Sequence, residues 1–159
     1  MTHRMASAAL ALLGLLVSLY LWLWKTGALG LLACGDGACE RVQLSPYAQI
    51  AGVPVAFLGV VGYFAILAVS LAGLQEPLVR RRWPTDAIVI MAGIGVAFSA
   101  YLTYLEAAVI QAWCRWCIVS AVIIVAILAA GIVGQRGLTP PAPRTSPSTP
   151  PPPPGPPAS

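Results

Sequence analysis

The stretch AWCRWCIVSAVIIVAILAAGIVGQR, residues 112–136, joins a Cys-x-x-Cys motif to a long apolar run. Residues 116–135 carry no charge between Arg115 and Arg136. A helix that rises about 1.5 Å per residue needs about 20 apolar residues to cross roughly 30 Å of hydrocarbon. The stretch therefore predicts a transmembrane helix with two cysteines at its start.

Three further uncharged stretches lie upstream. Residues 5–24 and 87–105 are each long enough for one crossing. Residues 42–75 are too long for one span and begin with polar side chains, so we assign the crossing to 54–74 and expect 42–53 to lie over it. The sequence thus predicts an all-α, polytopic membrane protein, a bundle of four transmembrane helices with a short interfacial helix over its outer mouth.

The composition agrees with a membrane protein of one domain. Of 159 residues, 58% are hydrophobic and 9% are charged, against about 25% charged residues in soluble domains. This excludes an ordinary soluble enzyme. The net charge is +4, but the basic residues are scattered among apolar runs and form no single patch, which argues against a nucleic-acid partner.

The first apolar run has a second interpretation as a secretory signal peptide. The apolar part of such a peptide is usually about 7 to 15 residues long. Here about 20 apolar residues end at Trp22, Trp24 and Lys25. We therefore favour a retained helix.

Lysine and arginine are in excess on the cytoplasmic side of most membrane proteins. One side of the predicted bundle carries six of them and the other three, which places both termini in the cytoplasm. The cluster at 80–82 has an alternative use in binding lipid headgroups, and we favour the topological one. The two sets are Arg4, Arg80, Arg81, Arg82, Arg136 and Arg144, against Lys25, Arg41 and Arg115.

Residues 138–159 differ abruptly from the membrane domain, 1–137. Eleven of the 15 prolines lie between Pro140 and Pro157. Proline lacks the N–H that helices and sheets need, so we predict a disordered, Pro-rich cytoplasmic tail. A polyproline segment that docks into an SH3-like groove is the alternative.

The predicted topology places all four cysteines on the outer face, where disulfides persist. Cys34 and Cys39 lie in the outer loop 25–53, and Cys114 and Cys117 begin the last span. The N–H groups and the positive end of a helix dipole favour a thiolate there, and Arg115 adds a charge. Zinc bound by the four thiols is a competing account, but the CGDGAC spacing is too wide for a zinc knuckle, so no metal is expected.

Two features of the outer loop and one of the third span have open roles. The ring closed by Cys34 and Cys39 contains two glycines, so it fits a mobile disulfide and a static brace equally. Ser45-Pro46 is typical of a helix N-terminus, and the Ser45 hydroxyl is either a cap or a ligand contact. We expect Glu106 to be an interfacial or capping carboxylate and not a proton relay.

The order of these features resembles the bacterial members of the vitamin K epoxide reductase family. A loop cysteine pair is followed by a serine six residues after its second cysteine, by two spans, and by a CxxC that opens the fourth span. The likeness covers roughly residues 5–135. The strings that carry it are CERVQLSPY from Cys39, GVPV from Gly52, YLTYLE from Tyr101 and AWCRWCIVS from Ala112.

The resemblance implies a four-helix bundle around a quinone, ubiquinone or menaquinone, in the bacterial cytoplasmic (inner) membrane. Cys114 and Cys117 would be the active-site pair and Cys34 and Cys39 the shuttle. A thioredoxin-fold partner would exchange with an exposed Cys34, and Cys39 would form a mixed disulfide with Cys114. Cys117 would face the quinone, and Ser45 would lie near a quinone carbonyl.

Three differences from the family qualify this transfer. The loop cysteines are closer together than in many relatives. Ala121 replaces the tyrosine that the vertebrate enzymes carry one turn after CxxC, which places Ala121 at the expected quinone contact. No thioredoxin domain follows the fourth span, so the implied partner is a separate protein.

The implied reaction is net disulfide formation, in which the quinone takes two electrons and two protons from the CxxC dithiol. The rival hypothesis is a non-enzymatic small membrane protein whose cysteines form structural disulfides. A transmembrane thiol conduit would need cysteines inside the spans or on both sides, and this sequence has none there.

Overall fold

A computed structural model describes residues 2–30, 32–34, 37–75, 78 and 81–137. Within these residues, four helices are long and apolar enough to cross a membrane. This confirms the predicted helical bundle and fits a multi-pass membrane protein. The predicted tail and Arg80 lie outside the described residues. The long helices are α1 (Thr2–Lys25), α3 (Val55–Ala72), α5 (Trp83–Leu105) and α6 (Arg115–Gly137).

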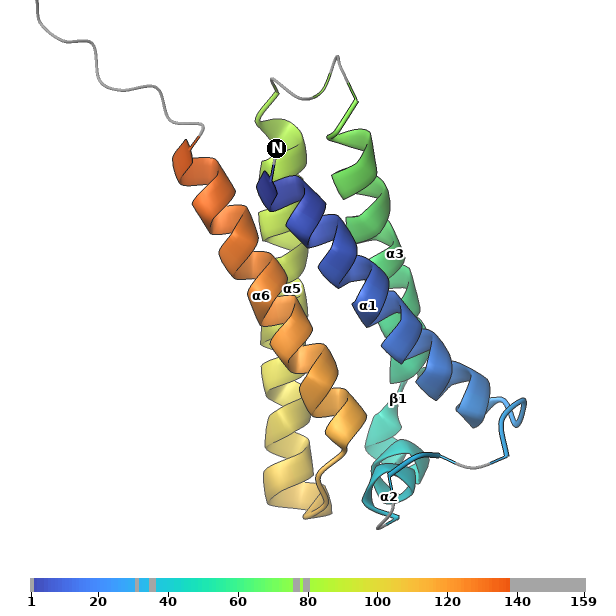
Figure 1. Cartoon of the computed structure of the whole chain (residues 1–159). Coiled ribbons are helices and arrows are strands. Elements are labelled where there is room, and N and C mark those ends of the chain that lie inside the picture. The colour runs from blue at the N-terminus through green and yellow to red at the C-terminus, as the bar shows by residue number, and fades with distance from the viewer. Residues whose placement is uncertain (1, 31, 35–36, 76–77, 79–80, 138–159) are drawn as a thin grey trace, which may run out of the picture.

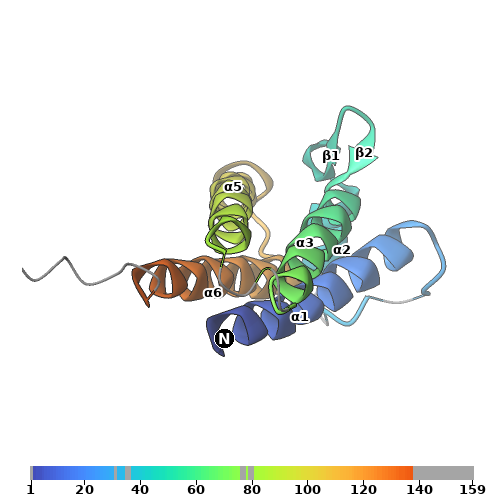
Figure 2. The ribbon, with the colours of Figure 1, turned by 90° about the horizontal axis from the view of Figure 1, so that it is seen from above.

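The helices form two neighbouring pairs. The beginning of α1 and the end of α6 lie at one end of the bundle, and α2 (Ala38–Leu44) lies at the other (Figure 1). Seen from above, α3 lies beside α1 and α5 beside α6 (Figure 2). Buried side chains of all four helices form the core in the middle of the bundle, among them Ala11, Tyr63, Ile66, Ile88, Ala92 and Ile127.

Two helices have ends that differ from the predicted spans, and in α5 the cause is a charged residue inside the helix. The third span begins at Trp83 and not at 87, because Asp86 in the first turn is favourable beside the positive end of the helix dipole. Its C-terminal end continues into η2, a π-helical turn over Glu106–Ile110. The second span, predicted as 54–74, is Val55–Ala72.

The short interfacial helix lies earlier in the chain than predicted. It is α2, and the predicted segment 42–53 overlaps only its last residues, 42–44. Next come a single 3-10 turn, η1 (Pro46–Ala48), and a small hairpin of β1 (Gln49–Ile50) and β2 (Val53–Pro54). Ala51 and Gly52 both have positive φ, 51° and 82°, as a two-residue hairpin turn requires.

Ser45 lies between α2 and η1, and the first of the two roles left open for its hydroxyl, a side-chain cap of the following turn, is not formed. Its Oγ donates to the carbonyl of Val42 at 2.7 Å, so it closes the helix before it. Pro46 is at the first position of η1, but no side-chain cap bond begins that turn. The reason is that Ser45 directly follows α2, so its hydroxyl is already bonded to the last turn of that helix.

Arg4 fixes the end of the bundle at which α1 begins and α6 ends. It is buried, and its guanidinium donates to the carbonyls of Gly73, Leu78 and Arg81 and to the Thr85 hydroxyl. The carbonyls at the end of a helix have no intrahelical partner. Arg4 of α1 therefore satisfies the end of α3 and the segment that leads to α5.

Arg4→Met should lower the free energy of unfolding by about 1–3 kcal/mol or more, because buried carbonyls lose their donor. Thermal unfolding in detergent, followed by circular dichroism, measures the loss. Arg136→Met, at an exposed arginine near the same end, is the matched control and should leave the Tm unchanged. Equal Tm values for the two variants would contradict this account.

Candidate functional site

The structure brings the four cysteines together. Cys34, Cys39 and Cys114 are members of one buried cluster, and Cys117 packs against it. Cys34 and Cys39 form a disulfide with a Cα–Cα separation of 6.0 Å, within the usual range of about 4.4–6.8 Å. Cys114 and Cys117 are free thiols. The bonded loop pair thus lies against the reduced CxxC pair.

The C-terminal end of α1 holds the loop in place. The Tyr20 hydroxyl accepts a hydrogen bond from the Ala33 N–H at 2.9 Å, next to the first loop cysteine. Lys25 Nζ donates to the carbonyl of Gln43 on α2. The Tyr20 ring also lies 5.2 Å from the ring of Trp116, between the two CxxC cysteines. One helix end therefore contacts both the loop and the start of α6.

The expectation of an exposed Cys34 is wrong. The residue is only 3% exposed, and Leu32 and Val42 are buried in the same cluster. The reason is that the chain after the loop folds back as α2 onto the bundle, which covers the disulfide with apolar side chains. Cys34 is therefore not accessible from the surface in this arrangement.

The CxxC motif begins α6, as predicted. The Cys114 carbonyl accepts the first helical hydrogen bond, from Ile118, at 3.0 Å. The pKa of Cys114 is lowered, first by a hydrogen bond from the Cys117 thiol and then by the N–H groups of Cys117 and Trp116; burial and the Glu106 charge act in the opposite direction. Arg115 is exposed to solvent, where its charge is screened.

Two residues next to the CxxC pair were not predicted as site residues. Glu106 Oε2 accepts a hydrogen bond from the Cys114 N–H at 3.0 Å, and Glu106 lines the same spaces as Cys117. This confirms the expected capping contact. Gln43 Nε2 lies 3.8 Å from Cys117 Sγ and donates to it.

The signals for these two residues differ in strength. Glu106 is the only acidic residue between 87 and 159, and a carboxylate inside a membrane span is by itself a functional hypothesis. That signal was available from the sequence. Gln43 carried none, because its side chain meets Cys117 only once α2 folds onto the bundle.

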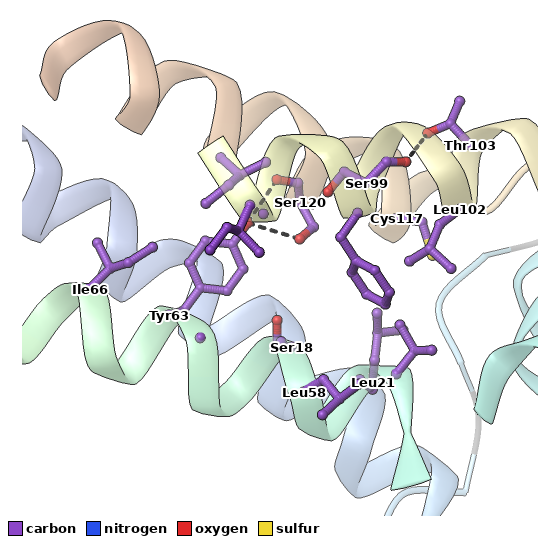
Figure 3. Close-up of a pocket in the computed structure, with 18 of the residues that line it drawn as sticks. Ser18, Leu21, Leu58, Tyr63, Ile66, Ser99, Leu102, Thr103, Cys117 and Ser120 are labelled. Carbon is purple, nitrogen blue, oxygen red and sulfur yellow. Dashed lines mark hydrogen bonds between the residues drawn. The ribbon is translucent and has the colours of Figure 1, made fainter. Parts of the chain in front are cut away.

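A cavity of about 340 Å³ lies between α1, α3, α5 and α6, and Cys117 is part of its wall (Figure 3). Most of the wall is apolar, including Leu21, Ile66 and Leu102. On the α3 side, the Tyr63 hydroxyl donates to the Ser120 carbonyl at 2.8 Å. The cavity thus combines apolar walls, a few hydroxyl groups, the Gln43 amide, the Glu106 carboxyl and one free thiol.

The cavity opens sideways, on the face of the bundle between α3 and α5. Leu58 of α3 and Ile94 of α5 line it, yet they are 38% and 66% exposed on the outer surface. Those apolar surfaces face the hydrocarbon when the helices span a bilayer. An apolar molecule dissolved in the membrane therefore has a direct route to Cys117.

The two other predicted quinone contacts lie away from this cavity. Ser45 lines a small adjoining recess of about 30 Å³, together with Gln43, Glu106 and Cys117. Ala121 is half-buried on α6 and is not among the residues that line either space. On that helix, Ser120 and Ile124 face the large cavity instead.

These features define a class of protein, a helical membrane protein with two juxtaposed cysteine pairs at one end of its bundle. The model of the vitamin K epoxide reductase family matches residues 5–132, most of the chain. The chain belongs to this family. Membership indicates a redox enzyme with a disulfide oxidoreductase role, and the family in general is associated with quinones.

The thiolate of Cys114 should form at a lower pH than an ordinary cysteine thiolate, because the Cys117 thiol donates to it. Cys117→Ala removes this donor, so the Cys114 titration should move to higher pH. Cys117→Ser keeps a hydroxyl donor and should shift the titration less. Thiolate absorbance in the ultraviolet, with Cys114→Ser as the blank, measures the midpoint. Identical midpoints in all proteins would contradict the assigned cause.

Proposed function

We propose that the protein is a quinone-linked thiol–disulfide oxidoreductase that reoxidises a separate, extracytoplasmic thioredoxin-fold protein. The observation that carries the proposal is the double position of Cys117. This residue belongs to the CxxC pair and also to the wall of a membrane-facing cavity. A thiol placed in this way connects disulfide exchange to an apolar electron acceptor.

The cavity fits a quinone in size and in chemistry. Ligand pockets commonly measure about 300–1,000 Å³ and are apolar with a few placed polar groups. Here five residues supply hydroxyl groups, and Gln43 and Glu106 add an amide and a carboxyl group, in a wall that is mostly apolar. The hydroxyl groups belong to Ser18, Tyr63, Ser99, Thr103 and Ser120. A bound quinone would supply the capacity to accept two electrons and two protons. Ubiquinone and menaquinone share this capacity, and either suits the cavity.

Electrons would travel from the partner through the loop pair to CxxC. The partner dithiol exchanges with the Cys34–Cys39 disulfide, so the partner is oxidised and the loop is reduced. Cys39 then attacks Cys114 of a Cys114–Cys117 disulfide, which forms a Cys39–Cys114 mixed disulfide and releases the Cys117 thiol. Cys34 attacks Cys39 and releases Cys114, which leaves the loop oxidised and CxxC reduced. The structure has this last pairing. Transfer of two electrons and two protons to the quinone restores the CxxC disulfide.

The proposed location is the bacterial cytoplasmic membrane, with both termini inside and the cysteines outside. The support is the arginine excess in the sequence at the end of the bundle where α1 begins and α6 ends (Figure 1). An outer position for the cysteines also lets their disulfides persist.

Cys114→Ala and Cys117→Ala should each abolish quinol formation, because a single thiol cannot deliver two electrons and close a disulfide. The assay is oxygen-limited, with the purified protein, a reduced thioredoxin-fold substrate and ubiquinone or menaquinone, and quinone absorbance as the readout. Turnover that persists in either variant contradicts the proposed active site. No quinol from the wild-type protein, with only a loss of stability in the variants, supports structural disulfides instead.

Gly62→Leu should raise the KM for quinone, because a leucine at this position projects into the cavity. Gly62 lines the cavity, and a Cβ there meets nothing within 4 Å. Gly93→Leu is the matched control, since Gly93 is equally open but does not line the cavity. Exchange with the thioredoxin-fold substrate should remain in both variants. Equal KM values would show that quinone binds elsewhere.

A further inference from the structure

Glu106 is a buried carboxylate whose partners belong to the CxxC pair. It is 3% exposed, and within the part of the chain that the structure describes it forms no ion pair with lysine or arginine. Its carboxyl accepts from the N–H of Cys114 at 3.0 Å, and it lines the same two spaces as Cys117. A helix cap needs only the hydrogen bond to Cys114. The shared position in both spaces places a carboxylate beside a reacting sulfur.

An unusual backbone path produces this contact. η2 widens the end of α5 into a π-helical turn, a feature that is frequent at functional sites. Gln111 follows with φ of 52°, in the left-handed region that non-glycine residues rarely adopt. The Ala112 N–H bonds back to the Glu106 carbonyl at 3.2 Å. The chain therefore returns over Glu106 just before it begins α6.

Of the described residues that line both spaces together with Cys117, Gln43 and Glu106 have polar side chains. Gln43 Nε2 donates to Cys117 Sγ and cannot take a proton. Lys25 approaches only the Gln43 carbonyl. The ionisable side chains around Glu106 are those of Cys114 and Cys117 at the start of α6, and Tyr47 of η1 lines the small recess with it. Glu106 thus combines a position beside Cys117, burial and the capacity to hold a proton.

Against the expectation from the sequence, we propose that Glu106 is a catalytic residue, which takes the proton of the Cys117 thiol when the CxxC pair is oxidised. This inference rests on the proposed function and adds the proton route to it. Two S–H bonds break and one S–S bond forms, while two electrons pass to the quinone. Glu106 carries the Cys117 proton to a quinone oxygen and becomes a carboxylate again. The Cys114 proton leaves to the aqueous side, and water supplies the second proton of the quinol.

Glu106→Gln is the test, because it keeps an oxygen acceptor for the Cys114 N–H but cannot take a proton. Single-turnover quinone reduction by the reduced protein should slow by roughly 100- to 10,000-fold, the usual size of a general-base contribution. The wild-type rate should rise with pH and level off once Glu106 is ionised, because the carboxylate is the acceptor. The variant should show no such plateau and should keep gaining rate as the pH rises. Glu106→Asp, which keeps a carboxyl group, should recover part of the rate.

An exchange assay with a soluble aromatic disulfide tests the role of Glu106 without any quinone. Attack by Cys114 releases one aromatic thiol, and the later attack by Cys117 on the mixed disulfide releases a second. Glu106→Gln should slow only the second release. Asp86→Asn, the same carboxylate-to-amide change at the opposite end of the bundle, should slow neither.

The outcomes of the two assays are distinct. A slowed second release in a protein that reduces no quinone would overturn the proposed function and leave the role of Glu106 standing. An unchanged second release would overturn the role of Glu106. A slower variant with the wild-type pH profile would do the same, because a purely structural effect leaves the profile in place.

Discussion

The hydrogen bond from the Cys114 N–H to the Glu106 carboxylate joins the end of one membrane helix to the start of the next. The first N–H groups of a helix have no intrahelical acceptor, and near hydrocarbon the protein itself must supply one. Here Glu106 satisfies the group at Cys114, and the Cys114 sulfur accepts from Trp116 and Cys117. The contacts that satisfy the helix start also orient the two thiols. Stability and redox chemistry therefore depend on the same few atoms.

The two ends of the bundle are built in different ways. At one end a single buried arginine, Arg4, binds three backbone carbonyls and a hydroxyl, which fixes α1, α3 and the beginning of α5 together. At the other end, the cysteine loop is held by one hydrogen bond that Tyr20 accepts, one that Lys25 donates, and a small apolar cluster. Segments that must open are drawn from the less stable parts of a fold. The contrast suits a loop that moves on a scaffold that does not.

The sequence predicted those features that depend on local composition. The length of an uncharged run determines whether a helix can span the bilayer, so the four spans and the CxxC at the start of the last one were predictable. Helix ends were not, because Asp86 inside a first turn stabilises the helix and does not end it. The burial of Cys34, the position of Ser45 and the contact between Gln43 and Cys117 all depend on how the outer loop folds back. No periodicity or spacing in that loop encodes this path.

On the proposed function, the two substrates reach the CxxC pair from different phases. Cys114 is buried with the loop disulfide, on the side that a water-soluble partner would approach. Cys117, within one helical turn of it, lines a cavity that opens between α3 and α5 toward lipid. Exchange with the loop therefore need not displace the quinone, and quinone entry need not open the loop. Because the two sulfurs lie within one helical turn, they can close a disulfide with each other. Its formation releases both electrons at the same site.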